Sequence, residues 1–264
     1  MSGPLTGRRR RGRLNPPKED GVRLCMELSD AGLVLAGDGV NLTVMDLAED
    51  KLITSMQTDG VSCLKAARYL CCAQLNGEVK LRDTRSLQAA HTLAAHAGVV
   101  TAMDVRGDLM VTVGMSSFRG QLKTETAVKV FDLRRTPRPL ASMPTHLAPS
   151  LLKYNPKFSS TLVTASTDGV FQHCDVGGLF AIAGLAQVGR FTQTDLPTTA
   201  TLLTTVALYG PPPSPASSLW RPNPYSGAQV SANGLSALDV SPSGELMCFG
   251  DHDGTVLLWA ENPG

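Results

Sequence analysis

A short strand-like motif recurs along this chain, and its copies are separated by roughly 40 residues. Within each copy apolar and polar side chains alternate, which is typical of a β-strand with one buried and one exposed face. The copies that we align are Val40–Asp46, Glu78–Asp83, Ala127–Asp132, Val170–Asp175 and Thr255–Ala260. One such unit cannot bury its apolar faces alone, so the repeat predicts a fold in which similar units pack against one another.

Turn signals and further strands accompany the motif. Asn76-Gly77, Asp168-Gly169 and Asp253-Gly254 stand just before three of the copies, and glycine accepts the positive φ angle that a tight hairpin turn requires. The strand-like runs upstream of these turns include Val99–Val105, Leu109–Val113, Leu235–Val240 and Leu246–Phe249. Four short strands per unit at this period predict an all-β fold, a WD40-type β-propeller with about five recognisable blades.

Several positions match the short signatures of such repeats, namely a Trp-Asp pair at the end of one strand and a Gly-His pair before the next blade. The match is degenerate, because Trp259 alone supplies the tryptophan and no blade has both pairs. The residues that we assign to these structural blade signatures are Asp83, His96, Phe131, Asp132, Asp253, Gly254 and Trp259.

The repeat divides the chain into four parts. Residues 1–20 form a basic tail, residues 21–176 hold the propeller blades, residues 177–233 form an irregular insertion rich in Pro and Thr, and residues 234–264 are the final blade. One blade carries an extra loop, Ser116–Glu125, between its second and third strands. The chain stops directly after its last strand, so we expect an incomplete or fragmentary ring.

Composition fits one large domain with a substantial core, since the chain has 264 residues, 42% of them hydrophobic, and a net charge of +1. No apolar run reaches the roughly 18 residues of a membrane span, and the arginine-rich N-terminus lacks the hydrophobic segment of a secretory signal. The six cysteines contain no C-x-x-C pair. We expect free thiols that are buried or partly buried, in an intracellular protein, rather than disulfides or a zinc site.

Two segments leave a choice between a functional and an ordinary interpretation. The tail contains Arg8–Arg11 and Arg13 and could be a nuclear-localisation or RNA-contacting arm, or a solvated, disordered leader. The segment Trp220–Tyr225 is rich in Pro and aromatic residues. Such a segment could dock onto a partner groove as polyproline II, or serve as an exposed linker.

The sequence contains no recognisable catalytic motif. Two-metal hydrolysis needs clustered carboxylates, and the nearest candidate, Asp251-His252-Asp253, lies in a predicted hairpin turn and is better explained as turn chemistry. A G-x-S-x-G elbow, an H-E-x-x-H pair and a Walker loop are all missing. We read His96 and His173 as structural residues. The prediction is a chain without catalytic residues, metal, cofactor or small-molecule substrate.

Four arginines are the candidate interaction residues. They lie at or just after the ends of the last motif strands of two consecutive blades, and they are Arg82, Arg85, Arg134 and Arg135. Together they could form a shared basic patch that binds an acidic partner or phosphates. The alternative is that they are solvated turn arginines.

The chain resembles the N-terminal WD40 domain of the catalytic subunit of the poly(A)-nuclease (PAN) deadenylase complex. The similarity runs through most of residues 21–176 and 234–260, and its strongest segments are Gly60–Asp83, Asp104–Phe118, Ala127–Arg134 and Leu238–Trp259. The resemblance implies a non-catalytic scaffold that supports mRNA poly(A)-tail shortening. It also implies a regulatory subunit as partner, indirect contact with the poly(A) ribonucleoprotein, and a location in the cytoplasm and its P-bodies, with the nucleus also open.

Two other functions remain open on the sequence. The chain could be a general WD40 adaptor with an unrelated protein partner, because the opening blades of the family domain are replaced by the basic tail. It could also be a weak RNA-binding protein that uses the tail and the arginine loops. A steep salt dependence of RNA binding that disappears when residues 1–20 are deleted would indicate the third function.

Overall fold

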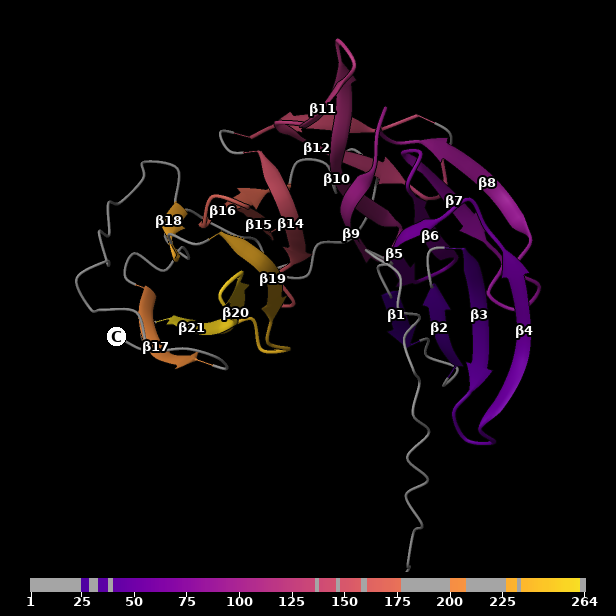
Figure 1. Cartoon of the computed structure of the whole chain (residues 1–264), viewed down its shortest axis with the longest axis horizontal. Coiled ribbons are helices and arrows are strands. Elements are labelled where there is room, and N and C mark those ends of the chain that lie inside the picture. Colours follow the sequence, from indigo (N-terminus) through magenta and orange to yellow (C-terminus); the bar gives the residue numbers. More distant parts are fainter. Residues whose placement is uncertain are drawn as a thin grey trace, which may run out of the picture.

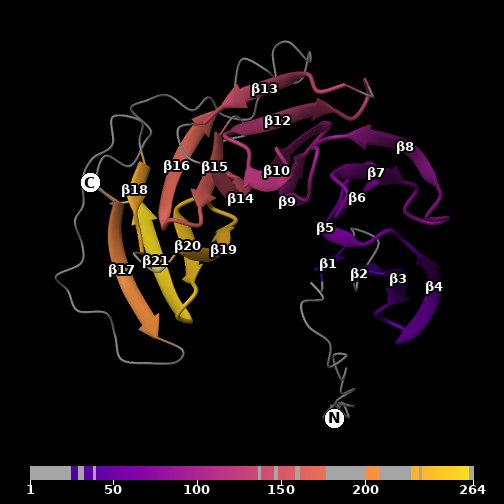
Figure 2. The same cartoon turned by 45° about the horizontal axis from the view of Figure 1, so that its top comes forward.

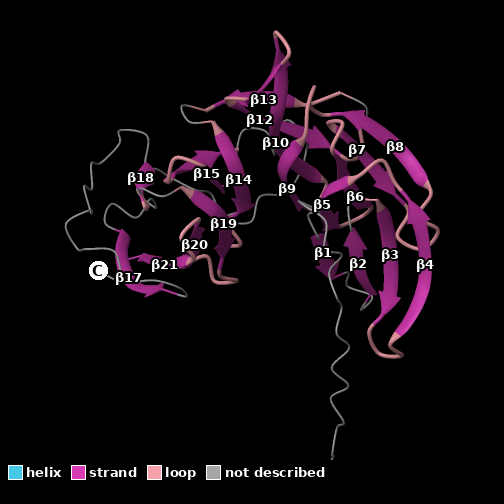
Figure 3. Ribbon diagram, in the orientation of Figure 1, coloured by secondary structure: helices cyan, strands magenta, loops and turns pink. Residues whose placement is uncertain are grey.

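The described elements of the computed structural model are all β-strands (Figure 3), so the predicted all-β fold is confirmed. The structure describes residues 25–28, 33–37, 40–135, 138–145, 148–157, 161–176, 200–207, 227–231 and 234–261. The basic tail and most of the Pro-rich part of residues 177–233 lie outside these ranges.

The first two blades are four-stranded antiparallel sheets in which the strands follow one another in chain order. The first blade consists of β1 (Cys25–Leu28), β2 (Leu33–Gly37), β3 (Asn41–Asp46) and β4 (Lys51–Gln57). The second blade consists of β5 (Val61–Ala66), β6 (Leu70–Gln74), β7 (Glu78–Arg82) and β8 (Ala89–Ala94). Their third strands are the sequence motif, which confirms the strand register expected from the repeat.

The third blade carries a projecting hairpin where the sequence suggested a loop. Its strands are β9 (Val100–Arg106), β10 (Leu109–Phe118), β11 (Gln121–Thr124), β12 (Ala127–Asp132) and β13 (Ala141–Pro144). The last four residues of β10 extend beyond the blade and pair with β11, turning at Arg119 and Gly120. This two-stranded ribbon rises from the rim of the molecule (Figure 1).

The last two blades share the segment between residues 177 and 233. The fourth consists of β14 (Pro149–Tyr154), β15 (Thr161–Ser166), β16 (Val170–Asp175) and β18 (Gly227–Gln229); the fifth of β19 (Leu235–Val240), β20 (Leu246–Asp251), β21 (Thr255–Glu261) and β17 (Ala200–Ala207). The segment expected to be irregular therefore supplies the outer strand of both blades. β17 precedes the rest of its blade in sequence and pairs with β21.

The five blades follow one another in an arc, and their innermost strands β1, β5, β9, β14 and β19 lie side by side in that order. Figures 1 and 2 both show the first and fifth blades at the two ends of the arc, standing apart from each other. Each blade therefore has neighbours on both faces only in the middle of the chain. The described residues form an open ring, as the sequence suggested.

The core is a series of apolar layers, one between each pair of adjacent blades. The layer between the second and third blades is typical and includes Val79, Leu81, Met103, Met110 and Phe131. Similar layers join the first blade to the second, the third to the fourth and the fourth to the fifth. Fully burying one such side chain contributes about 1.5–3 kcal/mol. The fold is therefore held together by contacts between neighbouring blades.

Glycine turns fasten each blade to the segment that leads into the next one. Gly77 and Gly169 both have positive φ angles, 90° and 85°. The carbonyl oxygen of Gly77 accepts hydrogen bonds from the backbone of Ala95 and His96, and that of Gly169 accepts one from Val230. A Cβ at either glycine would collide with the linking backbone. These two turn glycines are required by both conformation and space.

All six cysteines are free thiols, and each is buried or partly buried, which confirms the sequence prediction. Burial raises the pKa of Cys71 and of Cys72 to about 12. Their thiols therefore remain protonated at neutral pH and act as small apolar core residues.

Candidate interaction surface

The Asp at the end of the motif caps the turn that follows the third strand of a blade. The carboxylate of Asp83 accepts hydrogen bonds from the backbone N–H groups of Ser86 (2.8 Å) and Arg85 (3.0 Å), and these bonds lower its pKa. Asp46 accepts the N–H of Ala48 in the same way at 2.8 Å. This repeated role explains why the sequence keeps an Asp at this position.

Arg82 is buried, so it does not belong to an exposed basic patch. It precedes Asp83 as Phe131 precedes Asp132, and it therefore points into the layer between blades. Its Nη1 donates a hydrogen bond to the carbonyl oxygen of Leu87 at 2.8 Å and lies 3.4 Å from the sulfur of Met56 in the first blade. The long aliphatic stem of Arg82 fills the space that an aromatic ring fills in other blades.

The other three candidate arginines lie at the two turns, but they are not equivalent. Arg134 is held by Asp132, with its Nε and Nη2 atoms 3.0 and 2.9 Å from the two carboxylate oxygens, and it also lies 3.7 Å from Asp108. Its side chain lowers the pKa of Asp132. Arg135 is more exposed and lies 3.7 Å from the same carboxylate. Arg85 lies in the turn that Asp83 caps.

A shared patch of four unpaired arginines is therefore not what the structure contains. One guanidinium is buried and one is neutralised by a bidentate carboxylate. Arg68 of the neighbouring blade also reaches Asp108, at 3.9 Å. The turn of the third blade is a mixed network of cations and carboxylates that joins two blades.

His96 organises a buried polar network beneath the projecting hairpin. Its Nε2 lies 3.0 Å from the hydroxyl of Thr112 and its Nδ1 lies 3.1 Å from the carboxylate of Glu125. Lys129 donates a hydrogen bond to the carbonyl oxygen of Ala95 at 2.7 Å and lies 2.9 Å from Glu125. Burial, followed by the charge of Lys129, lowers the pKa of His96. The network links strands of one blade to the segment entering it.

The remaining signature residues are structural as well. Phe131 and Trp259 are buried in the layers before the third and fifth blades. In the last hairpin the carboxylate of Asp251 accepts the N–H groups of Asp253 (3.0 Å) and Thr255 (2.8 Å), while Gly254 has a φ of 79°. Asp251 thus shapes the turn, as the sequence interpretation holds.

A row of alternating charges, which sequence reasoning missed, runs along the innermost strands. Each strand carries one charged residue at the same level, and in every blade the next residue lies in the cross-strand row that ends at Met45, Arg82, Phe131, Cys174 or Trp259. The charged residues are Glu27, Lys65, Asp104, Lys153 and Asp239. Alignment of the inner strands by the position of their turns would have found them.

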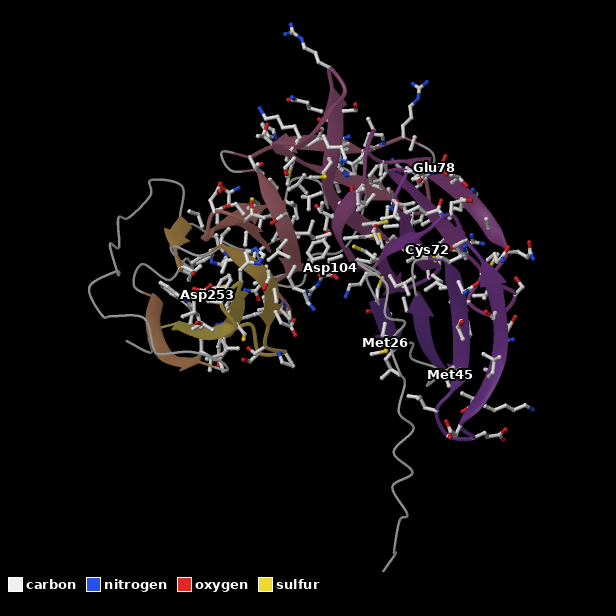
Figure 4. The ribbon with its side chains drawn as sticks, viewed as in Figure 1. Met26, Met45, Cys72, Glu78, Asp104 and Asp253 are labelled. Atoms are coloured by element: carbon white, nitrogen blue, oxygen red, sulfur yellow. The ribbon has the colours of Figure 1, made fainter. Side chains whose placement is uncertain are left out.

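Three of the contacts within this row are direct ion pairs. Lys65 lies 3.4 Å from Glu27 and 3.7 Å from Asp104, and Lys153 lies 2.8 Å from Asp239. Asp104 and Lys153 are linked through the backbone, because Asp104 Oδ2 accepts the N–H of Tyr154 at 2.8 Å. Figure 4 shows Asp104 on the inner side of the arc. The row ties four successive blade boundaries together at one level.

These residues offer a rigid binding surface, and their pairings are between protein groups. Within the residues that the structure describes, no three His, Cys, Asp or Glu side chains are grouped closely enough to hold a metal ion. The same residues contain no helix long and apolar enough to cross a membrane.

The strand order within each blade, the repeated turn caps and the layered core define a WD40-type β-propeller. The Neurospora crassa Pan2 WD40 domain has the same fold, with a TM-score of 0.65 at 17% identity, and the match covers 91% of this chain and 63% of that one. A family model described as PAN2 N-terminal matches residues 19–199. This chain therefore belongs to the PAN2 N-terminal family, which confirms the resemblance seen in the sequence.

Curated relatives agree with this assignment. The PAN2-PAN3 deadenylation complex catalytic subunit PAN2 of Gallus gallus is 26% identical over 240 residues, which cover 89% of this chain and 17% of that protein. The corresponding subunit of Schizosaccharomyces pombe is 32% identical over 146 residues, covering 55% and 13%. The chain thus spans less than a fifth of the length of these relatives.

Proposed function

We propose that this chain is a non-catalytic scaffold portion of a poly(A)-specific deadenylase catalytic subunit. In this role it supports the shortening of mRNA poly(A) tails by holding other components together, and it performs no chemistry of its own. The observation that carries the proposal is the family match over residues 19–199, which includes the four blades that precede the last one.

The rigid rim of the blades supports a role in assembly. Propellers present many loops on a stiff frame, and such loops are suited to holding protein partners. Here the third-blade turn is fixed by Asp132, Arg134 and Asp108, and the inner strands are fixed by the charged row. A surface with this little freedom loses little conformational entropy when it binds.

The partner in this proposal is the regulatory subunit, PAN3, and the poly(A) ribonucleoprotein is reached through it. The names of the relatives place those proteins in a PAN2-PAN3 deadenylation complex. The proposed site of action is the cytoplasm, including P-bodies. Arg85 and Arg135 are the two candidate arginines left for partner contact at the turns, since Arg82 is buried.

Co-purification tests the proposal. The full chain, carrying an affinity tag, is expressed together with PAN3 of Gallus gallus, and the complex is analysed by gel filtration with light scattering. We expect a stable complex of defined stoichiometry. Gallus gallus PAN2 added in excess should displace the chain from it.

The opposite result is equally informative. A folded, monodisperse chain that does not retain PAN3 would overturn the scaffold proposal and favour a general WD40 adaptor with another partner. The variant Arg85→Glu with Arg135→Glu tests the turns separately, and Lys51→Glu with Lys123→Glu, at exposed positions elsewhere, is the control with the same change in charge.

A further inference from the structure

The first blade has an apolar face that no described blade covers. In the second to fifth blades, the inner-strand residues on either side of the charged position pack against the preceding blade, and examples are Leu64, Met103, Tyr154 and Val240. The residues at these levels in the first blade are Met26 and Leu28, which are 61% and 63% exposed. Figure 4 shows Met26 on β1, at the end of the arc.

This open face continues across the whole sheet. The register places Leu28, Val34, Met45 and Leu52 in one row from the innermost strand to the outermost one. Leu52 is exposed as well. Met45 stands where Phe131 and Trp259 stand in the third and fifth blades, and both aromatic residues are buried against a preceding blade. An exposed apolar face of this kind is a typical protein-interaction site.

The fifth blade presents the matching kind of face at the other end. Leu246 stands at the level of Leu109, which the third blade buries fully against its successor, yet Leu246 is 41% exposed. Asp239 shows the same difference in its polar contacts. Asp104 Oδ2 accepts the N–H of Tyr154 from the next blade, whereas no residue in the described ranges donates to Asp239 Oδ2.

The charged row determines what can cover the open face. Lysine and carboxylate alternate from blade to blade, and both ends of the row are acidic, with Glu27 at one end and Asp239 at the other. A second copy of this chain stacked end to end would set these two carboxylates against each other. Like charges at an interface cost binding energy and exclude wrong partners. The complementary occupant carries a cation at this level.

We propose that the open face of the first blade is a docking site for a β-sheet of a partner protein that presents a Lys or Arg at the level of Glu27. The apolar row supplies the contact area, and Glu27 selects the partner by charge. Lys65 already occupies the other side of Glu27 in the same manner, which shows that this geometry accommodates a lysine. The proposal does not depend on PAN3.

The chain itself provides the probe, because its fifth blade has the shape that stacks on such a face and lacks only the right charge. The variant Asp239→Lys supplies the cation. We expect its self-association, measured by sedimentation velocity over a range of concentrations, to be at least about tenfold tighter than that of the unmodified chain. The variant Glu27→Lys should associate similarly, since it pairs with Asp239.

The double variant, Glu27→Lys with Asp239→Lys, is the decisive control. It again places like charges at both ends, so it should return to the monomeric behaviour of the unmodified chain. Glu49→Lys and Glu245→Lys change the net charge equally at exposed positions away from the inner strands, and they should not associate. Asp239→Asn removes the repulsion without crowding Lys153, so it should show an intermediate gain even if the lysine variants misfold.

Two outcomes would overturn the proposal. If both single variants and Asp239→Asn stay monomeric while circular dichroism shows them to be folded, the face does not accept a sheet with a complementary charge. If the unmodified chain associates as tightly as the variants, the face binds a second copy and Glu27 selects nothing.

Discussion

The third and first blades are built from the same strands, yet they differ in what surrounds them. The third blade is covered on both faces, and its core residues such as Leu109 and Phe131 are buried. The first blade is covered on one face, where Leu42 and Val44 pack against the second blade, while Met26 and Leu28 on the other face are exposed. Burial in this fold therefore depends on the neighbouring blade as much as on the strand itself.

This difference indicates how stability is distributed along the chain. Since each blade is stabilised mainly by the layers that it shares with its neighbours, an end blade has one such layer and a middle blade has two. Repeat proteins with nearest-neighbour contacts behave in this additive way. Substitutions at equivalent positions should therefore cost much more in the third blade than in the first.

The largest difference is expected for the aromatic position at the end of the third strand. Phe131→Ala should lower the free energy of unfolding by about 3–5 kcal/mol, because it leaves a cavity in a closed layer. Met45→Ala, at the same level in the first blade, should cost less than about 1 kcal/mol, since its layer is open. Urea denaturation followed by fluorescence measures both, and equal costs would refute the layered description.

A second comparison sets a turn between blades against the tip of the hairpin. Gly77→Ala and Gly120→Ala both force alanine into a positive φ angle, which costs about 1–2 kcal/mol. At Gly77 the new Cβ also meets the backbone of His96 and Gly98, whereas at Gly120 it meets nothing. Gly77→Ala should therefore cost at least about 1 kcal/mol more. A loss of stability confined to Gly120→Ala would contradict the fastening role of the turn.

Most of the fold could be predicted from the sequence because it depends on local signals. Period-two alternation and the glycine turns specify the strands of the first three blades, and the 40-residue repeat specifies their stacking. The outer strands β17 and β18 were missed because they are separated from their blades in sequence and lie near proline-rich stretches. The hairpin β10–β11 was missed because its polar residues resemble a loop.

The candidate site was harder to predict, because it depends on which way side chains point. Arg82 follows a charged pattern that suggests an exposed turn, but its level in the blade is that of Phe131, and so it points inward. The row from Glu27 to Asp239 consists of residues far apart in sequence, each unremarkable in its own strand. Only the register of the strands brings them to one level.

A third test compares the two carboxylates of this row. Asp104→Ala removes the acceptor for the N–H of Tyr154 at a closed boundary, and a buried donor left unsatisfied costs about 1–3 kcal/mol. Asp239→Ala breaks a partly exposed ion pair at the open end, which is worth up to about 1 kcal/mol. Asp104→Asn keeps an acceptor and should recover much of the loss. Thermal unfolding at constant pH measures all three, and a larger effect at Asp239 would contradict the comparison.

The smallest expected effect concerns pH and compares His96, enclosed in the middle of the arc, with His252, exposed at its end. Burial lowers the pKa of His96 in the folded chain below the usual 6.5, so the unfolded chain binds a proton more readily between the two values. Stability from the neutral imidazole is complete above pH 6.5 and is lost as the pH falls from there toward the folded pKa.

His96→Asn should therefore reduce the pH dependence of unfolding in this window, by no more than about 1 kcal/mol, since one pKa unit corresponds to about 1.4 kcal/mol. His173, whose pKa burial lowers to about 4, should leave a residual slope in the variant. His252→Asn should leave the profile unchanged. Urea midpoints measured at half-unit steps of pH give the slopes, and an identical slope in the unmodified chain and His96→Asn would show that the network around Glu125 and Lys129 accepts the proton without cost.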